Sequence, residues 1–278
     1  MAVTNFIQTI WSKKIQDDLE LKTKLVDNCL REYEGDVKYA RSVKILGVGE
    51  PTIGNYNTVL TAGTGIVPEE MSDRGQTLTI DQANFFAFYV DDINQAQSVP
   101  GLAEKYQEKA THGLAVKRDS YVASLIKGIT TTGHVTTATA KTADAAMAAI
   151  DEAIVALRER NFDEEGVIEI TPAVYNLVKT KLVELSTNNP EYIKKGIVGM
   201  YDGFTVIMSN NMAKDESGST KYAYCDIRGK KAIAFAGQIN EVESMRSEKF
   251  FKDIVRGLDT FGARVIDENR IQVVKFVI

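Results

Sequence analysis

The most constraining feature of the sequence is residues 36–128, a strand-like, acidic stretch that runs directly into one unusually long helical segment. Extended arms expose backbone N–H and C=O groups that need hydrogen-bond partners, and compact domains rarely contain long stretches without structure of their own. Such a stretch would therefore be unusual in a compact, monomeric enzyme. We expect it to find its partners on a neighbouring subunit.

Residues 98–128 contain the predicted helix. Pro100 suits the first helical turn, where its missing N–H costs nothing, and Gly128 ends the segment. Charged side chains, including Arg118 and Asp119, are expected to lie away from one apolar stripe. About 28 residues at a rise of ~1.5 Å make a rod of roughly 42 Å. The expected stripe consists of Leu102, Tyr106, Ala110, Leu114, Tyr121 and Leu125.

Two strands are expected ahead of the helix. Val37, Tyr39, Val43 and Ile45 alternate with other residues, and a period of two is typical of a half-buried strand. Residues 77–90 are rich in apolar and aromatic side chains, and the stretch between the two runs is rich in turn-forming residues. The sequence therefore predicts two long strands joined by a loop that projects from the body.

The projecting part is acidic. Residues 51–100 contain six acidic side chains and one basic side chain, a net of −5, which equals the net charge of the whole chain. An acidic arm on a balanced body suits docking on a basic patch of a neighbour, and a solvated acidic loop accounts for the same charge equally well. The candidate assembly contacts of this region are Arg41, Glu69, Glu70, Asp73 and Arg74.

Residues 3–31 are interpreted as an N-terminal arm made of helical segments interrupted by charge. Trp11 is the only tryptophan of the chain. Because large aromatic side chains contribute strongly to interfaces, Trp11 is a candidate anchor on a partner subunit. Packing on the chain's own core is an equally good account of this residue.

The rest of the chain predicts an α+β body, with helices packed on a small sheet. Thr142 is placed as the N-cap of an alanine-rich helix that runs through Arg160, and Thr171 followed by Pro172 begins a second helix. Gly166 is expected to open a strand between these two helices.

Turns and strands are expected after the second helix. Residues 196–204 contain several turn-forming residues, and two of them, Gly199 and Asp202, are further candidate assembly contacts. Strands dominate from residue 222 onward, interrupted by a charged bend at residues 241–252.

Composition excludes several classes of protein. The chain has 278 residues, of which 44% are hydrophobic, so it can bury the core of one large or two modest domains. No apolar run is long enough to cross a bilayer, and no secretory signal is visible. The pI of 5.3 argues against a surface built to grip nucleic acid. Cys29 and Cys225 lie far apart, which fits a reducing cytoplasm and leaves a disulfide between them open.

No motif for chemistry is found. His112 and His134 lack the neighbouring carboxylates or thiols that a metal site needs. Gly47 and Gly49 begin like a dinucleotide-binding fingerprint, but Thr52 stands where the third glycine is required. We therefore expect no catalytic residue, no cofactor and no metal, and the chain is predicted not to be an enzyme.

Several segments, in their order along the chain, resemble the major capsid proteins of tailed bacteriophages. The resemblance spans nearly the whole sequence, although each motif alone is unspecific. The segments are residues 3–7, residues 10–12, Ser42 to Gly49, Gln76 to Ala83, Val90 to Asp92, Gly199 to Val206 and Phe261 to Val265.

The resemblance implies the Hong Kong 97-type major capsid fold, an α+β fold with an N-arm, an extended loop, a long spine helix, a peripheral domain and an axial domain. By position, the parts would be residues 1–35 (N-arm), 36–97 (extended loop and peripheral-domain strands), 98–134 (spine helix), 135–238 (axial domain) and 239–278 (return to the peripheral domain).

The same resemblance implies a function. The chain would be a structural subunit that self-assembles into hexamers and pentamers of an icosahedral phage head, first as a procapsid. Its implied partners are a scaffolding protein, a portal at one vertex, a decoration protein and packaged double-stranded DNA held by weak, nonspecific contacts, with no membrane. The implied location is the virion, after assembly in the host cytoplasm.

Two other readings stay open at this point. An encapsulin-type nanocompartment shell shares the implied fold and would hold cargo enzymes instead of DNA. An uncharacterised α+β hydrolase would require a deep pocket with convergent polar groups. From the length of the sequence we expect no long N-terminal scaffolding region, so the scaffold function would lie in another protein. The residues of the covalent cross-link made by some relatives find no match here.

Overall fold

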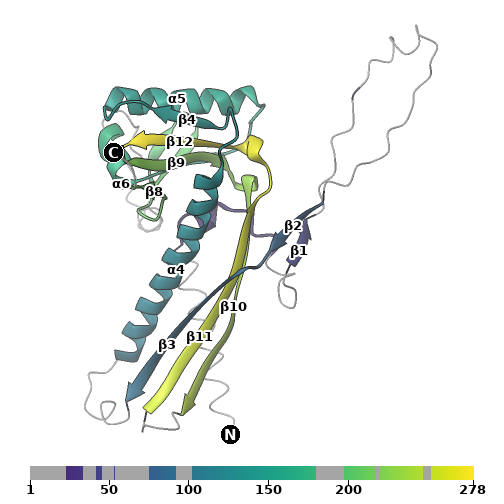
Figure 1. Ribbon diagram of the computed structural model, residues 1–278, viewed down its shortest axis with the longest axis vertical. Helices are drawn as coiled ribbons and strands as arrows, with labels where there is room; N and C mark the ends of the chain where they lie inside the picture. Colours follow the sequence, from purple (N-terminus) through teal and green to yellow (C-terminus); the bar gives the residue numbers. More distant parts are fainter. Residues whose placement is uncertain are drawn as a thin grey trace, which may run out of the picture.

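The computed structural model describes residues 23–33, 42–45, 53, 75–91, 102–179, 197–216, 220–246 and 252–278. Figure 1 shows an elongated molecule, with a sheet and helix α5 at one end and three long strands running away from them beside helix α4. Helices and strands are mixed without regular alternation, which confirms the α+β class.

A seven-stranded sheet forms the wide end of the molecule. It is larger than the small sheet that the sequence predicts. Strands β4 and β12 are parallel, as are β5 and β7, and the other neighbours are antiparallel. In order across the sheet, the strands are β4 (Val135–Ala138), β12 (Ile271–Val277), β9 (Tyr222–Gly229), β5 (Gly166–Ile170), β7 (Phe204–Met208) and β6 (Ile197–Tyr201), and β8 (Lys214–Asp215) pairs with β9.

Helices α5 (Ala143–Glu159) and α6 (Pro172–Val178) pack on one face of this sheet and share an apolar core with it. Both predicted N-caps are confirmed. The Thr142 hydroxyl accepts a hydrogen bond from the N–H of Ala145 at 3.3 Å, and the Thr171 hydroxyl accepts one from Val174 at 3.4 Å. Each cap supplies a partner to a first-turn N–H that has none within its helix.

Helix α4 (Leu102–Gly128) confirms the long predicted helix. The predicted stripe is correct for Leu114, which is buried, and wrong for Tyr106. Tyr106 is half exposed, whereas Arg118 and Asp119 are buried. The buried face follows the helical period and mixes polar with apolar side chains, because partners on other elements satisfy the polar ones. Its members are Gln107, Thr111, Leu114, Ala115, Arg118, Asp119, Val122, Ala123 and Ile126.

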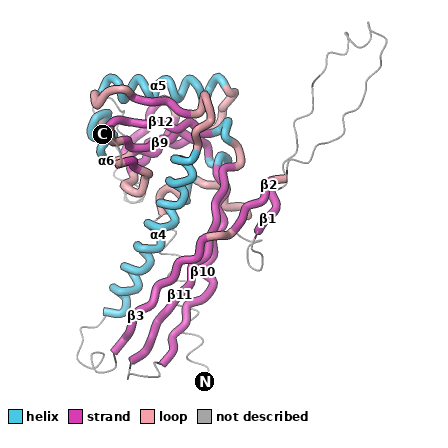
Figure 2. The backbone as a smooth tube through the Cα atoms, viewed as in Figure 1, coloured by secondary structure: helices cyan, strands magenta, loops and turns pink. Residues whose placement is uncertain are grey.

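The three long strands form an antiparallel sheet in the order β10 (Ile233–Arg246), β11 (Lys252–Val265) and β3 (Gln82–Asp91). Figure 2 shows α4 running alongside this sheet. The charged bend predicted at residues 241–252 is wrong over the described part, because β10 continues as far as Arg246. The charges are accommodated on the exposed strands, where Glu243 lies opposite Arg256 as a cross-strand ion pair.

Residues 75–91 do not form one long strand paired with the preceding one. Strand β2 (Gln76–Thr79) pairs with β1 (Ser42–Ile45), and the chain then crosses over to β11 and continues as β3. Val43 and Ile45 are buried, as their alternation predicts. The crossing places the backbone of Thr79 directly against Gly262 of β11, where only a hydrogen atom fits between them.

One N-terminal segment lies between the two large sheets. We call residues 23–30 the root segment. It contains a single 3₁₀ turn, η1 (Val26–Asn28), and Leu30 exchanges backbone hydrogen bonds with Ile233 and Phe235 at 2.8 and 2.9 Å. Leu25 and Val26 join an apolar core with α4, β10 and β12. Two further 3₁₀ turns are η3 (Lys230–Ala232) and η4 (Glu268–Arg270).

Candidate assembly surfaces and the buried polar cluster

The hairpin of β6 and β7 carries two of the predicted assembly residues. Asp202 and Gly203 form its two-residue turn with φ of 49° and 85°, a left-handed pair typical of tight hairpins. Arg158 of α5 holds the turn, because its guanidinium lies 2.8 Å from the Asp202 carboxylate and donates to the Asp202 carbonyl at 3.0 Å. Both side chains are about half exposed. Asp202 is therefore fixed and accessible at a surface turn.

Gly199 lies elsewhere on the same hairpin. It is a buried residue of β6, paired with Val206, next to a shift in register between Ile197 and Gly199. The expectation of turns throughout residues 196–204 is therefore wrong for Gly199, because strand pairing extends up to the Asp202 turn. A buried backbone position of this kind serves the hairpin itself and offers no side chain to a neighbour.

The other six predicted contacts, Trp11, Arg41, Glu69, Glu70, Asp73 and Arg74, lie outside the described residues. The structure therefore leaves them as expectations.

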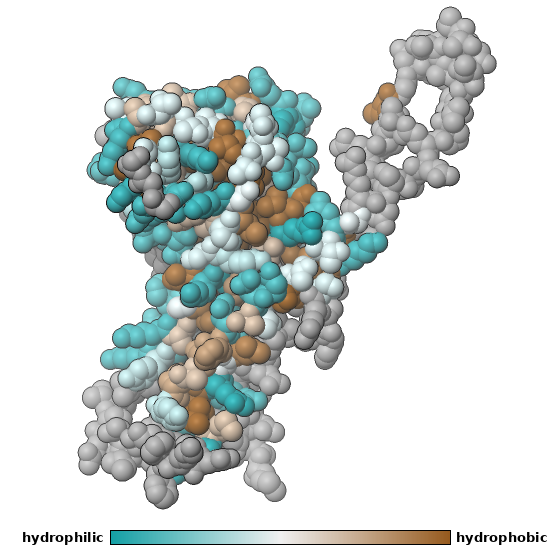
Figure 3. Space-filling model, in the orientation of Figure 1, coloured by the Kyte–Doolittle hydropathy of each residue, from teal (hydrophilic) through white to brown (hydrophobic). Residues whose placement is uncertain are grey.

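An exposed apolar face lies on the three-stranded sheet, on the side away from α4. Phe88 stacks on Tyr106 of α4 with ring centroids 5.8 Å apart, so the odd-numbered side chains of β3 point to the opposite face. Phe85 is 78% exposed and Tyr89 is 62% exposed. The strand register places Leu258 opposite Phe85 on this face, and Met245 follows on β10. Figure 3 shows apolar side chains at the surface over the long strands.

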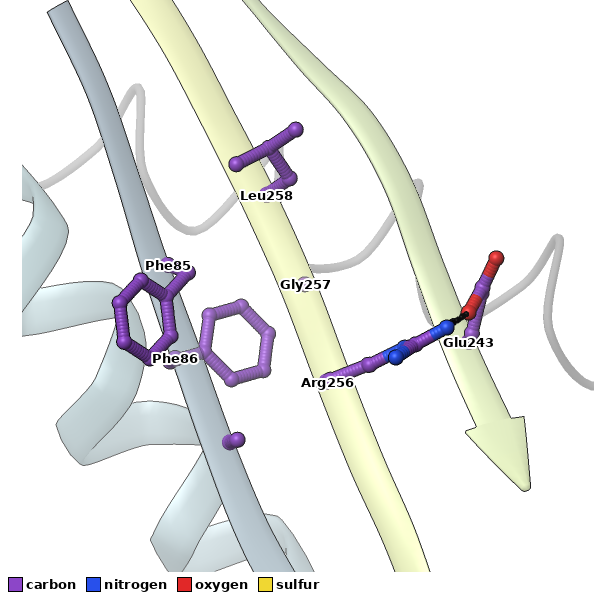
Figure 4. A pocket seen from close by; sticks show the side chains of 7 residues that line it. Phe85, Phe86, Glu243, Arg256, Gly257 and Leu258 are labelled. Atoms are coloured by element: carbon purple, nitrogen blue, oxygen red, sulfur yellow. Dashed lines mark hydrogen bonds and ion pairs between the residues drawn. The ribbon is translucent and has the colours of Figure 1, made fainter.

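A shallow hollow of about 540 Å³ crosses this face. Figure 4 shows the Arg256 side chain reaching across the strands to Glu243, with Phe85 and Leu258 nearby. The Phe86 ring lies beside Gly257, where an added methyl group would come within 2.5 Å of it. The ion pair is exposed, so the hollow lacks the deep, convergent polar groups of a catalytic pocket. It is better suited to packing against another surface than to chemistry.

Sequence reasoning missed this face. The signal was present, because Phe85 and Tyr89 share the odd-numbered side of a strand whose even side also carries Phe86 and Phe88. A strand that is apolar on both sides is typical of burial on both faces. Here one of those faces is left open in the subunit.

Asp119 of α4 fixes the start of the root segment. Its carboxylate accepts hydrogen bonds from the backbone N–H groups of Lys24, Leu25 and Val26 at 3.1–3.3 Å, and from the Asn211 side chain at 3.0 Å. Burial raises the pKa of Asp119 to about 6, although these hydrogen bonds act to lower it. The carboxylate supplies partners to N–H groups at the start of η1.

A buried polar cluster holds the other side of the root segment. It consists of Glu169 on β5 and Asp226 and Arg228 on β9, all completely buried. Arg228 donates to both Glu169 oxygens at 3.0 Å and to the carbonyls of Leu25 and Asn28 at 2.9 and 3.2 Å. Asn28 donates to Glu169 at 2.8 Å. The cluster thus ties the root segment to the seven-stranded sheet.

A second buried ion pair joins α4 to the three-stranded sheet. Arg118 forms two hydrogen bonds to Asp259 of β11, at 3.0 and 2.5 Å. Its guanidinium lies 5.6 Å and 5.8 Å from the ring centroids of Phe235 and Phe261. A planar, delocalised cation suits such aromatic neighbours. The ion pair therefore fixes the position of α4 against the three-stranded sheet, and the Arg118 guanidinium packs between aromatic rings.

Within the described ranges, no group of three or more histidine, cysteine or acidic side chains is arranged to hold a metal ion. Cys29 and Cys225 are both free thiols and both buried. Of the helices described, none is long and apolar enough to cross a membrane.

Comparisons with known proteins identify the family. A family model described as phage capsid protein matches residues 75–274. No curated protein matches the chain significantly. A solved chain from Mycobacterium phage Che8 is 25% identical, with a TM-score of 0.69 over 91% of this chain and 90% of that chain.

Two more distant structures share the fold. The capsid of Ralstonia phage GP4 is 13% identical, with a TM-score of 0.63 over 91% of each chain. The virus-like particle from Pyrococcus furiosus is 14% identical, with a TM-score of 0.56 over 96% of this chain and 99% of that one. The Hong Kong 97-type capsid fold expected from the sequence is thereby confirmed.

Proposed function

Because the chain belongs to the phage capsid protein family, we propose that it builds its shell from hexamers and pentamers held together partly through the exposed apolar face of the three-stranded sheet. The protein is a major capsid protein, a structural subunit without enzymatic activity that self-assembles into the icosahedral shell of the virion. The family match favours neither the nanocompartment nor the hydrolase reading.

The observation that carries the proposal is the exposure of large apolar side chains on this face, up to 78% for Phe85. Soluble monomers rarely leave such side chains grouped together, whereas proteins with interfaces do. In a shell made of copies of one chain, the partner that covers the face is a second copy. Many modest contacts of this kind add up through multivalency.

Replacing Phe85 with aspartate is expected to raise the protein concentration needed for shell assembly by about tenfold or more. Full burial of a phenylalanine contributes about 1.5–3 kcal/mol, and about 1.4 kcal/mol corresponds to tenfold in an equilibrium constant. Negative-stain electron microscopy over a dilution series, with and without a candidate scaffold protein, measures the effect.

Val155→Asp is the matched control, because Val155 is 54% exposed on α5, away from the apolar face. It is expected to raise the concentration needed for assembly less than the Phe85 variant does, because Val155 does not lie on the exposed apolar face. Normal shells from the Phe85 variant at every concentration would refute a role for this face. A stable monomer of the unmodified chain under all conditions would contradict the shell function itself.

The finer partition of the chain belongs to the proposal as well. Residues 1–35 would be the N-arm, residues 36–97 the extended loop with its strands, residues 98–134 the spine helix, residues 135–238 the axial domain and residues 239–278 the return to the peripheral domain. The fixed, accessible turn at Asp202 supports a contact between subunits there.

The arm and loop residues are proposed as further assembly contacts on their sequence properties alone. Deleting residues 55–75 should leave a folded body that no longer forms closed shells. In a separate variant, Trp11→Ala should weaken assembly more than folding. Electron microscopy and thermal melting of the same samples separate the two effects. An equal loss of melting temperature and of assembly in the Trp11 variant would assign that side chain to the core.

The remaining partners are proposed from the family relationship. They are a scaffolding protein, a portal, a decoration protein and packaged double-stranded DNA, with assembly in the host cytoplasm. The acidic net charge of −5 supports only weak, nonspecific contact with DNA, since phosphate binding requires clustered basic groups.

A further inference from the structure

The buried polar cluster contains two carboxyl groups and one guanidinium. Glu169 and Asp226 are directly opposite each other on neighbouring antiparallel strands, β5 and β9. Arg228 Nε lies 2.9 Å from Asp226 Oδ2, but among the described residues neither Asp226 oxygen accepts a hydrogen bond with good geometry. Like charges at such a position repel, and an unpaired charge without water is costly. One positive charge cannot balance two ionised carboxylates.

We propose that Asp226 keeps its proton while it is buried opposite Glu169 and that Asp226, Glu169 and Arg228 form a proton-dependent latch that holds the root segment against the body. With the proton in place, the cluster has no net charge, and Arg228 and Glu169 are free to bind the carbonyls of Leu25 and Asn28 and the Asn28 side chain. Loss of the proton leaves an excess negative charge beneath the root segment.

Geometry confines the latch to this segment. The cluster lies on the face of the seven-stranded sheet opposite α5, since Cys225 and Ile227, on either side of Asp226 in β9, belong to the core shared with α5. On its own face, the root segment supplies the covering backbone. The other charged or titratable side chains around the root segment are Lys24, Asp27, Cys29 and Asp119, and Cys225 lies next to Asp226 on the opposite face.

The direction of the pH dependence follows from linkage. Burial raises the pKa of Asp226 well above its usual value, and repulsion from Glu169 adds to this, while Arg228 opposes both. When the root segment leaves, water reaches the pair and Asp226 loses its proton. Opening is therefore favoured as pH rises from about 4, the pKa of a solvated aspartate, to the raised pKa of the closed state. The latch is strongest in acid.

Hydrogen exchange of the full chain tests the latch. Protection of the amides in residues 23–30, corrected for the intrinsic exchange rate, is compared between about pH 5 and about pH 7 in the natural chain and in Asp226→Asn. Asparagine resembles the protonated aspartic acid but does not titrate here. Asp119 titrates in both proteins, so its effect cancels when the protection factor of the natural chain is divided by that of Asp226→Asn. This ratio therefore reports the titration of Asp226. This ratio should fall by up to about tenfold per pH unit as pH rises.

A ratio that stays constant with pH would overturn the proposal. Root-segment amides that open only together with those of α5, at the same free energy, would also overturn it, because the segment would then have no separate opening. If Asp226→Asn fails to fold, Glu169→Gln provides the second variant. Removing the neighbouring negative charge should weaken the pH dependence, and an unchanged dependence in that variant would contradict the role of Glu169 in keeping the proton on Asp226.

Discussion

Replacing Arg228 with methionine is expected to lower the free energy of unfolding by about 3–5 kcal/mol, which is the usual cost of breaking a buried ion pair by removing one partner. The methionine fills similar space, so the loss comes from the Glu169 carboxylate, which would remain buried without a cation, and from the carbonyls of Leu25 and Asn28, which would lose their donor. Urea-induced unfolding of the full chain, followed by circular dichroism, measures the change.

Arg256→Met is the matched control, because the Arg256 and Glu243 side chains are 54% and 41% exposed. An exposed pair contributes only about 0–1 kcal/mol. Adding Glu169→Gln and Asp226→Asn to the Arg228 variant should restore part of its stability, since no buried charge then remains in the cluster. If the Arg228 and Arg256 variants lose the same free energy of unfolding, the burial of the Arg228 ion pair does not determine its contribution to stability.

Replacing Gly262 with alanine is expected to destabilise the protein by about 1–3 kcal/mol or more, the range of overpacked sites. The new methyl carbon would lie 2.1 Å from the carbonyl oxygen of Thr79 and 2.9 Å from its carbonyl carbon. Both are backbone atoms and cannot rotate away. The crossing from β2 to β3 must therefore separate from β11, and thermal unfolding would register the loss as a lower melting temperature.

The opposite result is expected for the same substitution on α4. Gly113 is exposed in the helix interior, and an added methyl group there meets nothing within 4 Å. Alanine should stabilise the helix by about 0.5–1 kcal/mol, because glycine loses more backbone freedom on folding. A stabilising effect at Gly262, or a destabilising one at Gly113, would contradict the packing described for these two sites.

The parts of the fold that were predicted correctly depend on short sequence motifs. The caps at Thr142 and Thr171, the strand that begins at Gly166 and the long helix ending at Gly128 each depend on a few neighbouring residues. Capping and turn formation are properties of short segments, so they can be read without knowledge of what packs nearby.

Errors arose where distant parts of the chain decide the outcome. Arg118 and Asp119 are charged, and a charged side chain on a helix is usually solvated. They are buried because Asp259 and the N–H groups of residues 24–26 meet them there. No pattern within the helix reveals these partners. Similarly, the strand expected over residues 77–90 divides because β1 and β11 pair with different halves of it.

For the candidate assembly residues too, local motifs were predictable and long-range contacts were not. Residue type correctly predicted a turn at Asp202. The same criterion predicted a turn at Gly199, which instead belongs to a buried strand. The exposed apolar face depends on the register of three strands that are far apart in the sequence. A single strand could not show which of its two apolar sides α4 would cover.

The contact between Leu25 and Arg228 spans 203 residues along the chain. During synthesis, which proceeds from the N-terminus, the root segment must wait for β9 before it can form this contact, and contacts of such sequence separation form late in folding. The root segment therefore cannot be fixed to β9 until about 200 further residues have been synthesised. Until Arg228 has been synthesised, the carbonyls of Leu25 and Asn28 lack the guanidinium that holds them in the folded subunit.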